Sequence, residues 1–265
     1  MLKKKSLYSL LIVTLLVITA CNGPQKILKS GNNQLKYETG VDLYEKGDYN
    51  KALQFFDILR AVYRGTEKGE TLTYYSANCY FQMRDYQIAS YYYNQYVQMY
   101  PRGSHAEESS YLTAYCSYME SPRSTLDQTN TYEALRQLQS FIDMYPKSPK
   151  VLEATKQMDD LRNKLEKKSY HIAVLYFKME DFQAAITSFE NLMENYPDTE
   201  YKEEVLFSIT EAYYSYAEKS IRSKKSERYE KTVEAFNNLK YLFPESKYLP
   251  IAQTYNDNAM KHLSN

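Results

Sequence analysis

The chain has 265 residues, and its 33 basic and 33 acidic side chains leave no formal net charge at pH 7. It therefore lacks the basic excess that nucleic-acid binding requires, and we expect no nucleic acid among its partners. Seven glycines, eight prolines and evenly spread charges exclude a low-complexity or disordered chain, whereas 30 tyrosines against no tryptophan make an unusual aromatic composition.

The first 20 residues are typical of a secretory signal peptide. Three lysines at positions 3–5 precede the apolar run Leu7–Ala20, which is shorter than the roughly 20 residues of a membrane-spanning helix. The small residues directly before Cys21 resemble a bacterial lipobox. That resemblance implies cleavage between Ala20 and Cys21 and a diacylglycerol thioether on Cys21. The alternative is an ordinary secreted protein with a chance cysteine at this position.

The residues after Cys21 predict where the anchor lies. Asn22 is not the aspartate that indicates inner-membrane retention, and no acidic cluster of the kind associated with surface display follows. We expect residues 21–32 to form a lipidated linker that holds the chain to the outer membrane, facing the periplasm. Loss of the three N-terminal lysines leaves 30 basic against 33 acidic residues, a formal charge of about −3.

A repeated pattern covers the rest of the chain. A small residue (Gly40, Ala77 or Ala173) is followed twelve positions later by alanine, four later by an aromatic residue, and eight later by arginine or proline. This pattern resembles the tetratricopeptide repeat, in which small residues let two helices approach and proline ends the second helix. The sequence therefore predicts an all-α solenoid of about five helix-turn-helix units with a C-terminal capping helix.

Two of these units need loop insertions to match the pattern. Glu120–Thr129 and Ser220–Ser226 are predicted to be extended connections, and Val151–Leu175 a single long helix, because it contains no turn signal between Lys150 and Tyr170. The expected array spans 33–263, with units at about 33–66, 70–103, 105–148, 149–199 and 200–246 and a cap at 247–263.

The first helix of each such repeat lines the concave surface, with its second, fifth, ninth and twelfth positions facing outward. Tyrosine occupies the fifth position in units one, two and four. It combines apolar contact area with a hydroxyl that reaches a peptide backbone, although tyrosines also pack between helices. The candidate groove residues are Tyr37, Tyr44, Tyr74, Asn78, Phe81, Tyr111 and Tyr115.

The lipobox, short linker and five repeats together resemble the BamD family of outer-membrane assembly lipoproteins, also called YfiO or ComL. Its most recognisable text here is the set of Tyr-Pro endings, as in NQYVQMYPRGSHAEESSY and FENLMENYPDTEYKEEVLFSI. The resemblance implies a subunit of the β-barrel assembly machinery. It further implies that the N-terminal repeats receive unfolded outer-membrane proteins and that the C-terminal repeats bind a POTRA domain of a BamA-type barrel subunit.

A mixed-charge segment in unit five is the candidate for that partner interface. Its basic residues stand close to Glu218, Glu227 and Glu230. Such segments are also common as solvated surface. The candidate interface residues are Arg222, Lys224, Lys225 and Arg228.

Nothing in the sequence predicts catalysis. The three histidines are far apart, no His-x3-His or Cys-x2-Cys spacing occurs, and no glycine-rich loop could hold a phosphate. We expect no enzymatic activity, cofactor or metal. Cys79 and Cys116 occupy matching positions in consecutive repeats, which an intervening helix separates, so we predict buried thiols and no disulfide.

Two other functions fit a lipid-anchored helical array. One is a cell-wall synthesis or envelope-division scaffold of the CpoB type, although those proteins usually place a coiled coil before their repeats. The other is a glycan-binding lipoprotein of the SusD class, which is about twice this length. The assembly-factor interpretation leads because it accounts for the whole chain.

Overall fold

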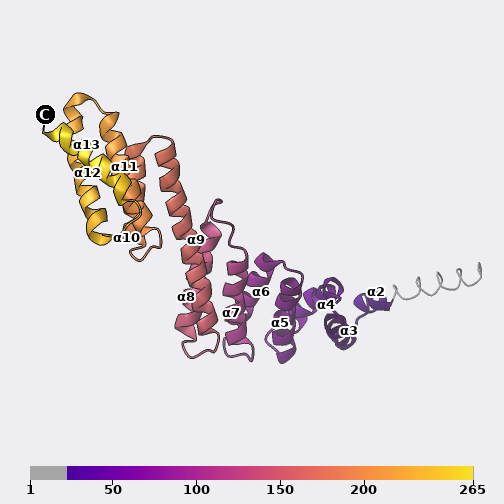
Figure 1. Ribbon diagram of the computed structural model, residues 1–265. Helices are drawn as coiled ribbons and strands as arrows, with labels where there is room; N and C mark the ends of the chain where they lie inside the picture. The colour runs from indigo at the N-terminus through magenta and orange to yellow at the C-terminus, as the bar shows by residue number, and fades with distance from the viewer. Residues whose placement is uncertain (1–22, 265) are drawn as a thin grey trace, which may run out of the picture. The chain divides into compact units, whose positions relative to one another are not determined.

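The computed structural model describes residues 23–264, and every regular element within that range is an α-helix (Figure 1). The predicted all-α fold is confirmed. The helices are α2 (Gly23–Leu28), α3 (Asn33–Glu45), α4 (Tyr49–Val62), α5 (Glu67–Gln82), α6 (Tyr86–Met99), α7 (Ala106–Met119), α8 (Thr129–Met144), α9 (Val151–Lys178), α10 (Phe182–Asn195), α11 (Lys202–Glu218), α12 (Arg222–Leu242) and α13 (Leu249–Leu263).

The helices divide into two compact units. Among the described residues, the first unit contains 23–122 together with Gln128–Asp159, and the second contains Arg123–Asp127 and 160–264. The boundary falls inside α9, the long helix that the missing turn signal predicted. In each unit, consecutive helices pack against one another in chain order, as in α3 with α4 and α11 with α12.

Small residues allow the paired helices to approach closely. A Cβ atom built on Gly40 would lie 2.9 Å from the Cβ of Phe55 and 2.9 Å from the ring of Phe56, so α3 and α4 meet where only hydrogen fits. Ala77, Ala114 and Ala173 stand at the equivalent positions of later units, and all three are buried. The small residues of the pattern thus mark the place where the two helices of a unit are in contact.

The turn between the two helices of a repeat has the same pattern in three repeats of this chain. A residue with positive φ is followed by an aspartate directly before the second helix, in the pairs Gly47-Asp48, Arg84-Asp85 and Glu180-Asp181. Two of the aspartates cap that helix, because Asp85 accepts from the Ile88 N–H at 3.3 Å and Asp181 from the Ala184 N–H at 3.2 Å. These turns end one helix and start the next.

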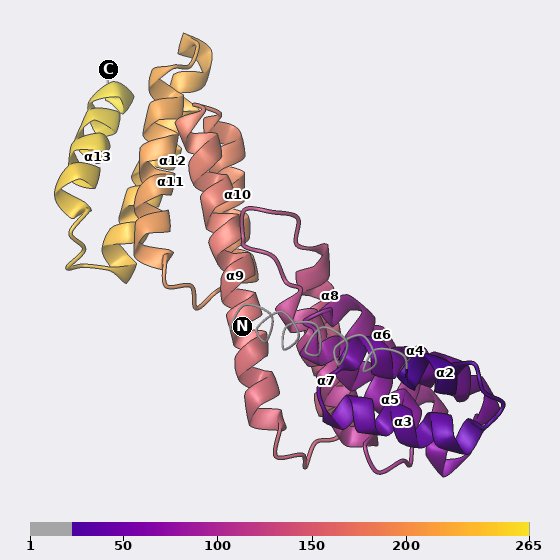
Figure 2. The same ribbon diagram turned by 90° about the vertical axis from the view of Figure 1, so that its right-hand side faces the viewer.

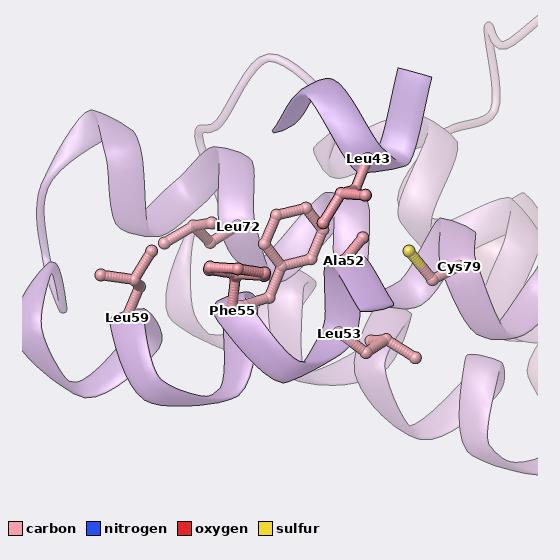
Figure 3. Packing of buried hydrophobic residues seen from close by; sticks show 8 residues of the cluster. Leu43, Ala52, Leu53, Phe55, Leu59, Leu72 and Cys79 are labelled. Atoms are coloured by element: carbon pink, nitrogen blue, oxygen red, sulfur yellow. The ribbon is translucent and has the colours of Figure 1, made fainter. Parts of the chain in front are cut away.

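The core of each unit forms between its repeats. In the first unit, Leu43, Phe55, Leu59 and Leu72 lie together with Cys79, and they come from α3, α4 and α5 (Figure 3). Aromatic side chains that the repeat pattern singled out fill the gaps between successive repeats. Phe56, Tyr93 and Phe189 are almost completely buried.

The two predicted connections have different outcomes. Residues 121–128 contain no helix, so the extended segment between α7 and α8 is confirmed. The prediction for Ser220–Ser226 is wrong, since α12 begins at Arg222. The guanidinium of Arg228 lies 3.5 Å from the ring centre of Tyr216 and donates to its hydroxyl at 2.8 Å, which holds the start of α12 against α11.

Helices flank the array at both ends of the described chain. The predicted capping segment contains α13, which packs against α12 and α11. The predicted linker contains the short helix α2, whose Ile27 and Leu28 pack against the first core cluster. Ala20 and Cys21, the predicted cleavage and lipidation residues, lie outside the described residues.

Both internal cysteines are free and buried, as predicted. Burial raises the pKa of each thiol to about 12, since the thiolate would lose its hydration. We therefore expect Cys79 and Cys116 to react with an aromatic disulfide reagent at least about 100-fold more slowly in the native protein than in urea. Absorbance of the released thiolate measures both rates, and rapid native reaction of either thiol would contradict the burial.

Candidate functional site

The candidate groove residues come from the first helices of three repeats in the first unit. Helix α3 carries Tyr37 and Tyr44, α5 carries Tyr74, Asn78 and Phe81, and α7 carries Tyr111 and Tyr115. These helices follow one another along the first unit in Figure 1, and Figure 2 shows the same unit turned by 90°. The structure separates the set into side chains that pack between repeats and side chains that stay partly exposed.

The fifth-position aromatics pack between repeats. Tyr74 stacks on His105 of the next repeat with ring centres 3.8 Å apart and planes within 6°. In the second unit, Tyr170 stacks in the same way on Tyr201 at 4.4 Å. Where the covering residue is lysine, its ammonium lies over the ring. The full set of pairs is Tyr37–Lys68, Tyr74–His105, Tyr111–Lys150, Tyr170–Tyr201 and Phe207–Tyr248.

The expectation of an outward-facing side chain is therefore wrong for Tyr74 and Tyr111, which are 8% and 6% exposed. Their hydroxyls are also occupied. Tyr74 donates to the Glu108 carboxylate at 2.7 Å, and Tyr111 accepts from Gln157 Nε2 at 2.9 Å. Burial, together with the Glu108 carboxylate, raises the pKa of Tyr74. Both tyrosines hold consecutive repeats together.

Asn78 also links repeats. Its amide donates to the Tyr44 hydroxyl at 3.2 Å, and its carbonyl accepts from the buried Tyr93 hydroxyl. The Tyr44 ring stacks on Tyr75 at 4.2 Å. Asn78 and Tyr44 both remain partly exposed, so they border the inner surface while their polar atoms are already paired.

The open part of the inner surface is a hollow that is lined by α7 and the start of α9. It has a volume of about 500 Å³, and its lining is Tyr111, Leu112, Tyr115, Pro149, Lys150, Leu152 and Glu153. The Tyr115 ring is partly exposed and lies 6.0 Å from that of Tyr111 and 6.1 Å from that of Phe81. The hollow therefore continues into an aromatic surface that reaches α5.

This hollow offers apolar contacts for an aromatic ring and one ammonium, that of Lys150, for an anionic group, and the Glu153 carboxylate also belongs to its lining. Leu152 is 67% exposed at its edge, and Tyr115 provides a ring face. The Lys150 ammonium lies 5.2 Å from the ring centre of Tyr111 and is exposed to solvent. In the part of the chain that the structure describes, no group of three or more His, Cys, Asp and Glu side chains is arranged to hold a metal ion.

The candidate basic residues lie on the first two turns of α12. Arg222 and Lys224 are exposed, and Lys225 is partly exposed. Arg228 is engaged with Tyr216 and Ser220, while Lys224 pairs with Glu227 at 3.2 Å. Lys224 and Arg228 line a mixed-charge hollow of about 390 Å³ between α10, α11 and α12.

Sequence reasoning missed the side chains that cover the fifth-position aromatics. In three pairs the covering residue follows its aromatic by 31 positions, which are Lys68, His105 and Tyr201. The aromatics themselves recur every 37 residues at Tyr37, Tyr74 and Tyr111. This 37-residue spacing was the signal for repeat-to-repeat stacking. Lys150 and Leu152 were missed because the long connection between α7 and α8 interrupts the spacing.

Within residues 23–264, no helix is both long enough and apolar enough to cross a bilayer. Among solved structures, the tetratricopeptide-repeat domain of P58(IPK) matches with 13% identity and a TM-score of 0.42, over 91% of this chain and 68% of that one.

Curated relatives match over most of the chain. The outer membrane protein assembly factor BamD of Caulobacter vibrioides is 24% identical over 200 residues, which cover 74% of this chain and 66% of that protein. The factor of the same name from Pasteurella multocida is 22% identical over 80% of this chain and 85% of that protein. The model of the YfiO family, described as outer membrane lipoproteins, matches residues 30–228. The chain thus belongs to the YfiO family of outer membrane lipoproteins.

Proposed function

We propose that this chain is an outer-membrane protein assembly factor, a lipid-anchored periplasmic scaffold that binds unfolded outer-membrane proteins and a BamA-type barrel subunit. Its curated relatives are named outer membrane protein assembly factors, which favours the assembly role over a cell-wall or glycan-binding scaffold. The observation that carries substrate binding is the hollow beside Tyr111, Tyr115 and Lys150. Binding there needs no chemical step.

The proposed ligand is the end of an unfolded outer-membrane protein, an extended strand with alternating aromatics and a terminal phenylalanine. Its terminal ring would lie against Tyr115 and Leu152, and its carboxylate would lie near Lys150. Side chains on one face of an extended strand repeat every two residues, about 7 Å. Phe81 is 6.1 Å from Tyr115, so a second substrate aromatic could contact it.

The second unit would supply the other binding surface. Arg222, Lys224 and Lys225 lie together at the start of α12, and the first two are exposed. The mixed-charge hollow beside them offers carboxylates and cations to a polar partner surface. We propose that the barrel subunit binds this surface, whereas the substrate binds the hollow beside Lys150.

We expect Lys150→Glu to weaken binding of a fluorescent peptide that ends in phenylalanine by about tenfold or more, because a charge that attracts the carboxylate becomes one that repels it. Fluorescence anisotropy with the full chain in nanodiscs measures the effect. Lys147→Glu makes the same charge change at an exposed position outside the hollow, and we expect it to leave the affinity within about twofold.

The C-terminally amidated peptide separates carboxylate recognition from general attraction. The amidated peptide should bind the unaltered chain more weakly than the free-acid peptide does. It should bind the Lys150→Glu and Lys147→Glu variants with equal affinity. Equal losses for the two variants with the free-acid peptide would refute the hollow as the substrate site.

A further inference from the structure

An apolar row lies exposed on the C-terminal half of α9, within the second unit. It consists of Ile172, Leu175 and Tyr176 on α9 and of Met179 directly after the last residue of the helix, and their spacing of three and four residues puts them on one face. Leu175 is 56% exposed and Met179 is 66% exposed. We call these four residues the α9 stripe. Four large apolar side chains on one uninterrupted face are unusual for a free helix surface.

The repeat register shows what covers this face elsewhere. Relative to the small residue of each first helix, Ile172 and Leu175 stand one position before and two positions after Ala173. In the fifth repeat, the buried Thr210 on α11 takes the place of the small residue. The positions one before and two after the small residue are buried in the other repeats with a preceding neighbour, as Ser76 and Cys79, Thr113 and Cys116, and Ile209 and Ala212.

In each of those repeats, the cover is the second helix of the preceding repeat. Cys79 packs in one core cluster with α4 residues, and Cys116 packs with α6 residues. Ile209 packs with α10 residues. The Tyr216 hydroxyl on α11 also donates a hydrogen bond to Gln183 on α10 at 3.1 Å. The α9 stripe is therefore a repeat-stacking face with the composition of a covered surface.

The first repeat shows how this chain treats such a face when it is meant for solvent. Three of the four equivalent positions in the first repeat are polar, namely Thr39, Asp42 and Lys46, and the fourth, Leu43, is buried in the first core cluster. Lys46 pairs with Asp42 at 2.6 Å. Terminal repeats of solenoids need polar outer faces of this kind. The α9 stripe has large apolar side chains at the same register, so it does not have the composition of a cap.

The border of the stripe is basic. Lys167, His171 and Lys178 are exposed on α9, and within residues 23–264 none of them forms an ion pair with a carboxylate. Lys168 donates to the Leu126 backbone carbonyl, which is an uncharged acceptor. The neighbouring acid Glu180 pairs with Lys219. An occupant with carboxylates along one edge would complement this border.

We propose that the α9 stripe docks an amphipathic α-helix of a partner protein, with acidic residues along the edge that faces Lys167, His171 and Lys178. The partner helix takes the place that the second helix of a preceding repeat takes on α5, α7 and α11. Apolar residues three and four apart on the partner fill the spaces between the stripe residues. An anionic lipid surface would meet the same charges, but helices cover the equivalent face in three other repeats.

Photo-crosslinking in intact cells tests the proposal with the full chain. Benzoylphenylalanine replaces Tyr176, and in a control it replaces Tyr241, which is 84% exposed on α12 of the same unit. We expect the probe at Tyr176 to give a protein adduct that is absent at Tyr241. Peptide mass spectrometry should map the adduct to a segment with apolar residues at helical spacing and an acidic edge.

Charge reversal tests the chemistry of the border. Lys167→Glu together with Lys178→Glu should lower the yield of that adduct by about three- to tenfold, since two attractive surface pairs become repulsive. Circular dichroism verifies that the variant keeps its helices. The proposal is overturned if the probe labels only lipid, forms no adduct, maps to a segment without an acidic edge, or gives an unchanged yield after charge reversal. Peptide binding at Lys150 is unaffected in every case.

Discussion

Replacing Phe56 with alanine is expected to lower the free energy of unfolding of the first unit by about 3–5 kcal/mol. Phe56 is fully buried on α4, 6.4 Å from the Tyr44 ring and 6.3 Å from the Tyr75 ring. It contacts α3 at Gly40 and α5 at Tyr75, so its removal leaves a cavity between two repeats. Urea unfolding followed by circular dichroism and tyrosine fluorescence measures the loss.

A matched substitution separates this cavity effect from the loss of an aromatic ring in general. Tyr132 lies on α8 of the same unit and is 62% exposed. Tyr132→Ala should change the free energy of unfolding by no more than about 0.5 kcal/mol. If Phe56→Ala and Tyr132→Ala have similar effects, Phe56 does not close the space between the repeats.

The protein is expected to unfold cooperatively as the pH rises from about 10 to about 12. The pKa values of Tyr96, Tyr213 and Tyr255 are each raised to about 12. Burial is the largest cause, and the neighbouring carboxylates of Glu70, Glu190 and Glu211 add to it.

The direction of this pH effect follows from the pKa values of tyrosine in the unfolded and the folded protein. An unfolded tyrosine ionises near pH 10, so below that pH both states bind the proton and the stabilisation is fully present. Between about pH 10 and 12 the unfolded chain loses these protons while the folded chain keeps them, and stability falls with each such tyrosine. Tyr74 and Tyr93, whose pKa values are also raised by burial, act in the same direction.

Absorbance at 295 nm and far-UV circular dichroism, recorded along one alkaline titration, measure this transition. Buried tyrosinates should appear together with the loss of helix. Tyr96→Phe should weaken the pH dependence, whereas Tyr241→Phe, at an exposed position on α12, should leave it unchanged. Ionisation of all 30 tyrosines near pH 10 with the helices intact would contradict the prediction.

Local pattern predicted the helices well because their causes are local. Gly40 and Ala77 are small since two helices meet there, and the residues between Met119 and Thr129 have no helical periodicity. The missing turn signal before Tyr170 likewise predicted one long α9. The segment Ser220–Ser226 was predicted wrongly, since α12 begins at Arg222, and the contact of Arg228 with Tyr216 on α11 is one that local pattern does not contain.

For the candidate site, the sequence and the tertiary structure provided clearly different information. From the sequence we could identify Tyr37, Tyr74 and Tyr111 as one recurring position, but the side that each ring faces depends on what covers it. His105 and Lys150 reach those rings from the start of the next repeat, 31 and 39 residues farther along the chain. Burial of Tyr74 and exposure of Tyr115 therefore follow from repeat stacking.

By itself, the sequence determined the repeat, the helix pairs, the buried thiols and the family, because each depends on residue types at fixed spacing. Only the tertiary structure decided which aromatics hold repeats together, where the hollow beside Lys150 lies, and which stacking face on α9 is left open. These properties depend on neighbours from other repeats, and the long connection between α7 and α8 changes the distance along the chain to those neighbours.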